Sequence, residues 1–232
     1  MQEPITGKRF LFHGHAVAAA GKITSPFQDI IPAQAASALS IDGGYSSARV
    51  GDFRHKEIFS FASAYSEVVG TYVEKSGGFY ETLSLTAIEK VNILDVVTCD
   101  RIVARITAKY AADGKTPPTV SIAGSRFERL RVGNDFFEKL DLAPDLLDKY
   151  GASGFGTALP AATTAGGEKE YLSEVLSEPR QFNISQFGDV FLGEHFPLPN
   201  LRHLVMLRVS LGCPVTGTVN VGGAVTGGDP YP

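Results

Sequence analysis

His13-Gly14-His15 is the most specific chemical pattern in the sequence. Side chains two residues apart on a β-strand point to the same side, so both imidazoles can reach one metal ion. His55 and Glu57 repeat this spacing, and His55 is the candidate third ligand. The pattern predicts a divalent-metal site at His13, His15 and His55. The alternative is that these are ordinary histidines and that Gly14 marks a bulge or close packing.

Tyrosines and arginines form a second set of candidate site residues. Tyr65 and Tyr72 lie in a β-rich stretch and are the candidate ligand-facing tyrosines. Arg126, Arg129 and Arg131 surround Phe127, a basic and aromatic combination that suits an anion or a single nucleic-acid strand. Glu128 interrupts this run, so a solvated strand face is the competing interpretation.

Motifs of several common enzyme classes are missing from the sequence. Ser153 lies in GASGFG, which lacks the closing glycine of the GxSxG nucleophile pattern. The glycine-rich segments lack the lysine and the following helix of a phosphate-binding loop. Cys99 and Cys213 do not form a CxxC pair, and two small buried side chains are a better interpretation than a disulfide or a reactive thiol. Catalytic residues therefore stay unassigned.

Alternating residues indicate the strands that must position these candidates. Ile102, Ala104, Ile106 and Ala108 alternate with more polar residues, which is typical of a strand with one buried face. One strand from Phe79 to Tyr110 would be roughly 105 Å long, so we expect the chain to fold back at Glu89–Asn92 or Leu94–Asp95. Ala112-Asp113-Gly114-Lys115 predicts a hairpin turn onto Thr119–Val132. Further strands are expected over Lys8–Ile23, Ala35–Ile41, Tyr45–Phe53, Glu57–Glu74, Phe182–Phe196, Leu201–Leu211 and Val215–Val225.

The same alternation assigns side chains to faces. Over Lys8–Ile23 it places one set of residues together on one side of the strand: Phe10, Phe12, Ala16, Ala18 and Ala20. Over Leu201–Leu211 it places His203 on the apolar side with Val205 and Leu207. His203 is therefore expected to be a buried core or interface histidine.

Residues 135–178 have a different pattern from the rest. Phe136, Phe137 and Leu140, then Leu146 and Leu147, have helical spacing, and Glu168–Ser177 also fits a short helix. We predict a mainly β fold, an antiparallel β-sandwich or barrel, with a short helical excursion around residues 136–178. The whole chain, residues 1–232, is expected to be one β-rich domain with an insertion at about 135–178.

Composition restricts the partners. The 232 residues carry a net charge of -4, which does not favour a nucleic-acid partner. No apolar run reaches the roughly 20 residues of a membrane-spanning helix. The first residues lack the apolar core of a signal peptide, so we expect a cytoplasmic protein, or a secreted one if a signal peptide has been removed.

Two functional hypotheses remain open. The first is a non-catalytic β protein that acts through self-assembly or through binding a protein or small molecule. Its strand edges predict a homo-oligomer, with the C-terminal segment or the helical excursion at the contact. The alternative is a small-molecule- or metal-binding β-barrel enzyme that uses His13, His15 and His55, with Tyr65 or Tyr72 nearby.

Overall fold

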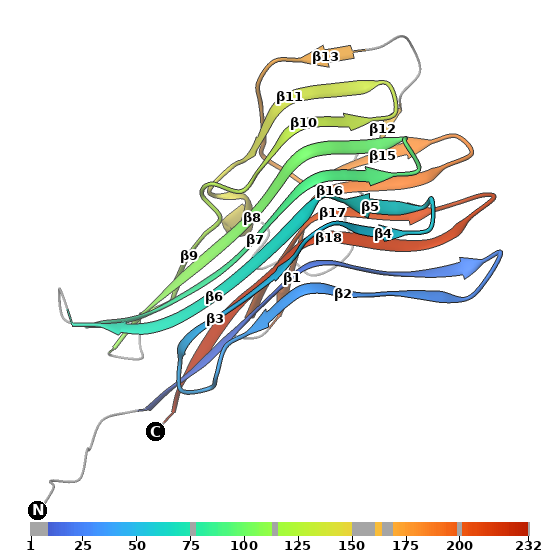
Figure 1. Ribbon diagram of the computed structural model, residues 1–232. Coiled ribbons are helices and arrows are strands. Elements are labelled where there is room, and N and C mark those ends of the chain that lie inside the picture. Colours follow the sequence, from blue (N-terminus) through green and yellow to red (C-terminus); the bar gives the residue numbers. More distant parts are fainter. Residues whose placement is uncertain are drawn as a thin grey trace, which may run out of the picture.

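The computed structural model describes residues 9–74, 78–112, 116–149, 161–163, 169–198 and 201–231. These residues form two β-sheets that pack face to face (Figure 1). The mainly β fold class is therefore confirmed, and the architecture is an open sandwich. Most neighbouring strands are antiparallel, and the parallel pairs are β11 with β13, β11 with β14, and β12 with β15.

The seven-stranded sheet joins the two ends of the chain. Its order is β12 (Ala161–Thr163), β15 (Arg180–Ile184), β16 (Gly188–Leu198), β17 (Leu201–Leu211), β18 (Thr216–Tyr231), β1 (Arg9–Ser25) and β2 (Asp29–Ala38). The C-terminal strand β18 pairs with β17 on one side and with β1 on the other. From Gly217 to Gly227 both edges of β18 are therefore paired within the chain, so this part of the strand is not the free edge that an intermolecular strand contact would need.

The eleven-stranded sheet contains the middle of the chain. Its main path runs β13 (Lys169–Tyr171), β11 (Asp135–Leu142), β10 (Arg126–Val132), β8 (Val97–Ala111), β7 (Phe79–Ile93), β5 (Phe59–Phe61) and β4 (Phe53–His55). Four strands join it beside this path: β3 (Gly44–Val50), β6 (Ser63–Val73), β9 (Thr119–Ser121) and β14 (Glu174–Leu176). The fold-back between β7 and β8 occurs at Leu94–Asp95, where both residues have positive φ. β8 pairs with β9 as predicted, although residues 113–115 of the expected turn lie outside the described residues.

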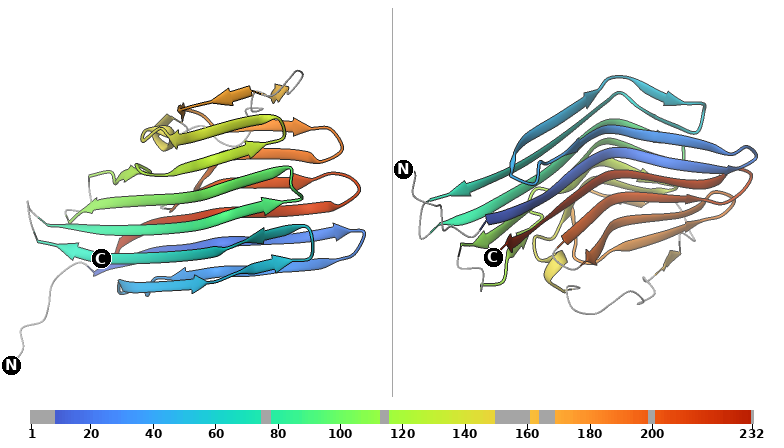
Figure 2. Two further views of the ribbon diagram at one scale, coloured as in Figure 1. Left: turned by 45° about the horizontal axis from the view of Figure 1, so that its top comes forward. Right: turned by 90° about the horizontal axis from the view of Figure 1, so that it is seen from below.

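A line of unpaired positions crosses each sheet, and the long strands that it crosses bend there (Figure 2). We call these two lines the bend lines. In the seven-stranded sheet the line runs through Gly193, Met206, Gly222, Ala18 and Ala35. In the eleven-stranded sheet it runs through Lys90, Asp100, Arg129 and Glu138. Positive φ angles at Ala35, Lys90, Arg129, Gly193 and Gly222 accompany the missing pairs.

The bend lines reverse which residues face the core, and this corrects two predicted face assignments, those of Ala20 and His203. In β1, Ala19 and Ile23 are buried after the line, whereas Ala20 turns outward. In β17, Leu207 and Val209 face the core, but His203 precedes the line and lies on the outer face. An extra residue between two alternating runs is the physical reason in both strands.

The predicted helical excursion was mostly wrong for the same reason. In β11, Phe137 and Leu140 both face the core because the unpaired Glu138 lies between them, and the resulting spacing of three resembles a helix. The described helix is α1 (Leu146–Lys149), a single turn that begins at the predicted Leu146 and Leu147. The second predicted helix, Glu168–Ser177, is replaced by β13 and β14 where it is described.

The side chains that fill the core differ between the two sides of the bend. On one side of the bend, large side chains such as Leu130, Phe137 and Phe182 are almost fully buried. On the other side, hydroxyl groups meet between the sheets: Ser66 donates to Ser37 at 2.9 Å, Ser84 donates to the Val225 carbonyl at 2.5 Å, and Thr82 pairs with Thr226. These small residues let the two sheets approach closely. The described part of the chain contains no helix long and apolar enough to cross a membrane.

Candidate functional site

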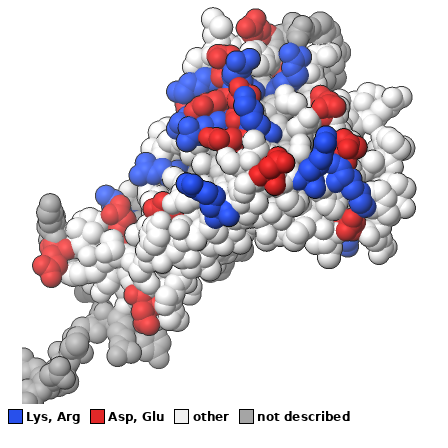
Figure 3. Space-filling view, in the orientation of Figure 1, with Lys and Arg blue, Asp and Glu red and all other residues white. Residues whose placement is uncertain are grey.

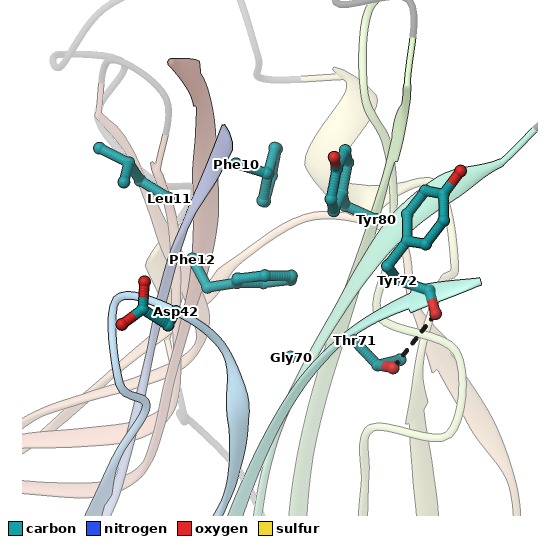
Figure 4. A pocket seen from close by; sticks show the side chains of 8 residues that line it. All are labelled: Phe10, Leu11, Phe12, Asp42, Gly70, Thr71, Tyr72 and Tyr80. Carbon is teal, nitrogen blue, oxygen red and sulfur yellow. Dashed lines mark hydrogen bonds between the residues drawn. The ribbon is translucent and has the colours of Figure 1, made fainter. Parts of the chain in front are cut away.

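An aromatic pocket opens between the two sheets at the end where the small residues meet (Figure 4). We use this name for the cavity of about 810 Å³ lined by Phe10, Leu11, Phe12, Asp42, Gly70, Thr71, Tyr72 and Tyr80. Its volume lies within the usual range of small-molecule pockets. It combines residues of both sheets with a row of aromatic rings.

Strand register builds one wall of the aromatic pocket. Tyr72 of β6 lies opposite Tyr80 of β7, which lies opposite Tyr110 of β8. The three side chains continue the inward-facing set that Thr82 and Ala108 define, because residues two apart share a face. The rings of Tyr72 and Tyr80 are 5.0 Å apart. Burial raises the pKa of Tyr110 to about 12, so this phenol stays neutral at physiological pH.

Strand β1 supplies the opposite wall. The ring of Phe10 stacks on Tyr80, with centroids 4.3 Å apart and planes 7° apart. Phe12 meets Tyr80 edge to face at 5.9 Å. Figure 4 shows both phenylalanines pointing from β1 toward the tyrosines. Such offset and edge-to-face arrangements are the favoured geometries of aromatic pairs.

Two glycines make room for Phe12. A Cβ at Gly70 would lie 2.6 Å from Leu39 Cδ2 and 2.8 Å from the Phe12 ring. A Cβ at Gly43, whose φ is +87°, would lie 2.9 Å from the same ring. Larger residues at either position would displace Phe12 and reshape the pocket. The Asp42 carboxylate is exposed beside Gly43 and lines the pocket.

Of the predicted ligand-binding residues, Tyr72 lies in this pocket and its side chain is 48% exposed. Tyr65 lies elsewhere, where its hydroxyl donates to Glu67 Oε2 at 2.5 Å and lies 3.4 Å from the Tyr45 hydroxyl. The bond to Glu67 raises the pKa of Tyr65. The sequence analysis missed Phe10, Phe12 and Tyr80 as one site, because alternation assigns each to a face but does not give the register between strands.

The three predicted arginines lie on β10 among acidic residues. Arg126 Nε lies 2.7 Å from Glu128 Oε1, and Arg129 Nε lies 3.6 Å from Asp100, which also pairs with Lys90 at 3.0 Å. Arg131 lies over the Phe136 ring at 5.9 Å. Figure 3 shows basic and acidic side chains intermingled on this face. The arrangement resembles the solvated strand face that the sequence left as an alternative to anion binding.

The structure does not bring the three predicted metal-binding histidines together. His13 and His15 lie on β1, where His13 Nε2 is 3.7 Å from Asp229. His55 lies on β4 of the other sheet, 3.4 Å from Asp29. Asp29 pairs with Ile23, eight residues beyond His15, which is roughly 26 Å along the strand. Within the described residues, no group of three histidine, cysteine or acidic side chains could hold a metal ion.

The two cysteines are free thiols in different surroundings. Cys99 is buried, with its sulfur 3.3 Å from the Arg101 carbonyl and 3.2 Å from the Glu128 carbonyl. Burial raises the pKa of Cys99 to about 12, which makes this thiol unreactive. Cys213 is exposed. The predicted burial therefore holds for Cys99 and not for Cys213.

Comparison with known proteins identifies a family but no characterised relative. No curated protein and no solved structure matches the chain significantly. A family model described as "Domain of unknown function (DUF8256)" matches residues 10–171. The match includes every residue that lines the aromatic pocket and ends before β15–β18. Because it covers well over half of the sequence, the chain belongs to this family of domains of unknown function.

Proposed function

We propose that this chain is a non-catalytic binding protein whose aromatic pocket takes up a small molecule with a flat ring. The observation that carries the proposal is the alignment of Tyr72 and Tyr80 opposite Phe10 and Phe12 in one open cavity. Flat rings gain contact area and favourable edge and face geometry against such a wall. The exposed Asp42 and Thr71 add hydrogen-bonding groups at the cavity.

The lining favours binding over catalysis. Its eight residues include one carboxylate and contain no histidine, lysine or cysteine. Nucleophilic catalysis needs a nucleophile within hydrogen-bond reach of a base, and this set offers no such pair. His13 and His15, two of the three histidines of the enzymatic alternative, lie on the other face of β1 from Phe10 and Phe12.

NMR titration with indole tests the proposal. Indole should shift the ring resonances of Tyr72 and Tyr80 and leave Tyr45, on the outer face, unchanged. For a ligand of this size we expect a Kd of about 1 mM or weaker. Methyl β-glucoside, titrated in parallel, distinguishes a sugar ring from an aromatic one.

A pair of tyrosine variants provides the control. Tyr72→Ala should weaken binding about fivefold, because one stacking contact is lost. Tyr45→Ala removes a ring that is 64% exposed and lies outside the pocket, so it should not change the affinity. Binding of both probes that is unaffected by Tyr72→Ala, or the absence of any shift at Tyr72 and Tyr80, would refute the proposal.

A homo-oligomer and a cytoplasmic location remain predictions from the sequence. The apolar residues on the outer face of the seven-stranded sheet are compatible with a contact between copies. Light scattering at tens of micromolar tests this directly, and a strictly monomeric protein would contradict it.

A further inference from the structure

A second hollow lies on the outer face of the seven-stranded sheet, where the sheet bends. It has a volume of about 430 Å³ and is formed by residues of β1, β2, β16, β17 and β18. We call it the outer pocket. In its floor Gly223 lies directly between Val17 and Val205, because the three residues are register partners on adjacent strands. Most of its exposed surface is apolar, as in typical small-molecule sites.

The glycine keeps the floor of the outer pocket open. A Cβ at Gly223 would have a single neighbour within 4 Å, the Val17 carbonyl oxygen at 3.3 Å. The adjacent Gly222 points the other way, and a Cβ there would lie 2.9 Å from Met206 and 3.3 Å from Ile102 of the opposite sheet. Gly222 therefore serves the bend and the core, whereas Gly223 leaves free space above the sheet.

Each polar side chain that lines the outer pocket can donate a hydrogen bond. Arg208 and Asn220 are register partners at one end of the pocket. The Arg208 guanidinium is held in place by two bonds to Glu194, Nε to Oε2 and Nη2 to Oε1, both 2.7 Å long. It also lies 3.7 Å from the centre of the Phe191 ring. This pairing leaves Nη1 as the nitrogen that can receive a further acceptor.

Two histidine side chains lie at the end of the outer pocket that is opposite Arg208 and Asn220. His203 and His15 flank Val225 in one row across β17, β18 and β1. Burial lowers the pKa of both histidines, and the charge of His15 lowers the pKa of His203 further. Near neutral pH each ring is therefore uncharged and keeps one N–H donor. The Phe196 ring lies 5.6 Å from the His203 ring and closes this end.

We propose that the outer pocket binds a small organic carboxylate with an apolar body. The carboxylate would accept hydrogen bonds from Arg208 Nη1 and Asn220, in the geometry that makes arginine a common carboxylate ligand. The body would lie over Val17, Gly223 and Val205 and extend toward His203 and Phe196. No acidic side chain is among the residues that line the pocket; the Glu194 carboxylate is paired with Nε and Nη2 of Arg208, so an added carboxylate would share this guanidinium through Nη1.

Calorimetric titration with 4-cyclohexylbutyrate tests whether binding requires the negative charge. This probe has a carboxylate, a flexible linker and a saturated ring that is not flat, and 4-cyclohexylbutanamide is its neutral counterpart. We expect a Kd for the carboxylate below about 1 mM and binding of the amide at least about tenfold weaker, because only the carboxylate gains a charge-assisted bond to Arg208. Equal affinity for the two probes would overturn the proposal.

Two substitutions locate the site on the protein. Asn220→Asp keeps the shape of the side chain but adds a negative charge beside Arg208, so it should weaken carboxylate binding at least about tenfold and leave amide binding unchanged. Gly223→Leu fills the floor and should abolish binding of both probes. Carboxylate affinity that survives either change would place the site elsewhere and refute the proposal.

Matched controls separate this site from the aromatic pocket and from general unfolding. Gly51→Leu adds the same atoms at a glycine whose Cβ would have no neighbour within 4 Å, and it should leave the titration unchanged. Tyr72→Ala should also have no effect on the binding of 4-cyclohexylbutyrate, because Tyr72 lines the other cavity and the probe has no flat ring to stack on it. If Tyr72→Ala removed the binding and Gly223→Leu did not, the carboxylate would be a ligand of the aromatic pocket and the outer-pocket proposal would fail.

Discussion

On the outer face of the eleven-stranded sheet, side chains of opposite charge lie next to one another, as Arg126 with Glu128 and Lys139 with Asp141 show. The outer face of the seven-stranded sheet is different at its centre, where Val17, Val205 and Gly223 surround a hollow. Both sheets bury their inner faces in the same core. Folding therefore requires only one apolar face on each sheet. The apolar centre on the outer face of the seven-stranded sheet is not part of this core.

The difference indicates which face is available for binding. Charged residues that pair across strands are well solvated and contribute little to stability or recognition. An apolar surface with a few fixed donors gains free energy when a ligand displaces water from it. Three sets of variants test this difference between the two faces. The largest expected change in the free energy of unfolding is at the two adjacent glycines, followed by the ion pairs and then the histidines.

Gly222→Ala should lower the free energy of unfolding by about 2–4 kcal/mol, because φ is +72° and the new Cβ would press on Met206. Gly223→Ala should change it by less than about 1 kcal/mol, because its Cβ points into the outer pocket. Urea denaturation of both variants measures the difference. Equal losses would mean that the outer face is packed as tightly as the core.

The ion pairs of the two faces should differ by a smaller amount. The Glu194 side chain is 11% exposed and holds Arg208 with two bonds, whereas the Glu128 side chain is 36% exposed. Glu194→Gln should cost about 1–2 kcal/mol of unfolding free energy. Glu128→Gln should change it by less than about 0.5 kcal/mol. Urea denaturation of both variants measures these changes. A larger loss of unfolding free energy for Glu128→Gln than for Glu194→Gln would contradict the expected difference between the two faces.

Lowering the pH should weaken the seven-stranded sheet selectively. Burial lowers the pKa of His15, His195 and His203 in the folded protein, so the unfolded chain binds protons more readily. The stability is fully present above the unfolded histidine pKa of about 6.5 and is lost as the pH falls below it. The free energy of unfolding should therefore decrease from pH 7.5 to 5.5.

A histidine variant checks this pH dependence. His203→Gln removes one of the three shifted groups and should reduce the decrease, measured by urea denaturation at both pH values. A stability that is constant between pH 7.5 and 5.5, or a slope unchanged by the substitution, would show that these imidazoles are not desolvated.

The sequence predicted much of the strand content and little of the site. The alternation of Ile102, Ala104 and Ile106 correctly gave an inner face, since a period of two depends only on local geometry. The same rule failed at His203 and Ala20, because each lies near an unpaired residue that shifts the alternation. The spacing between Phe137 and Leu140 imitated a helix for this reason. A single interruption that recurs in several predicted strands is the signal that a bend line leaves in a sequence.

The candidate sites depend on register, which local patterns do not specify. Tyr72 was recognised as a candidate, but its alignment with Tyr80 and Tyr110 requires the pairing of three strands. His15 was grouped with His55, yet the fold places His15 and His203 on either side of Val225, although these two histidines are 188 positions apart (203 − 15) in the sequence. Neighbours of this kind are made by long-range pairing, so no spacing rule within one strand can reveal them.

The amino-acid sequence by itself determined that this chain consists mostly of strands, because alternation and glycine-rich turns act over a few residues. Only the tertiary structure decided which strands pair, where both sheets bend and which side chains meet in the two pockets. The physical reason is that hydrogen-bonded pairing between distant strands fixes these neighbours, and the residues at the bend lines then select which face of each strand is buried.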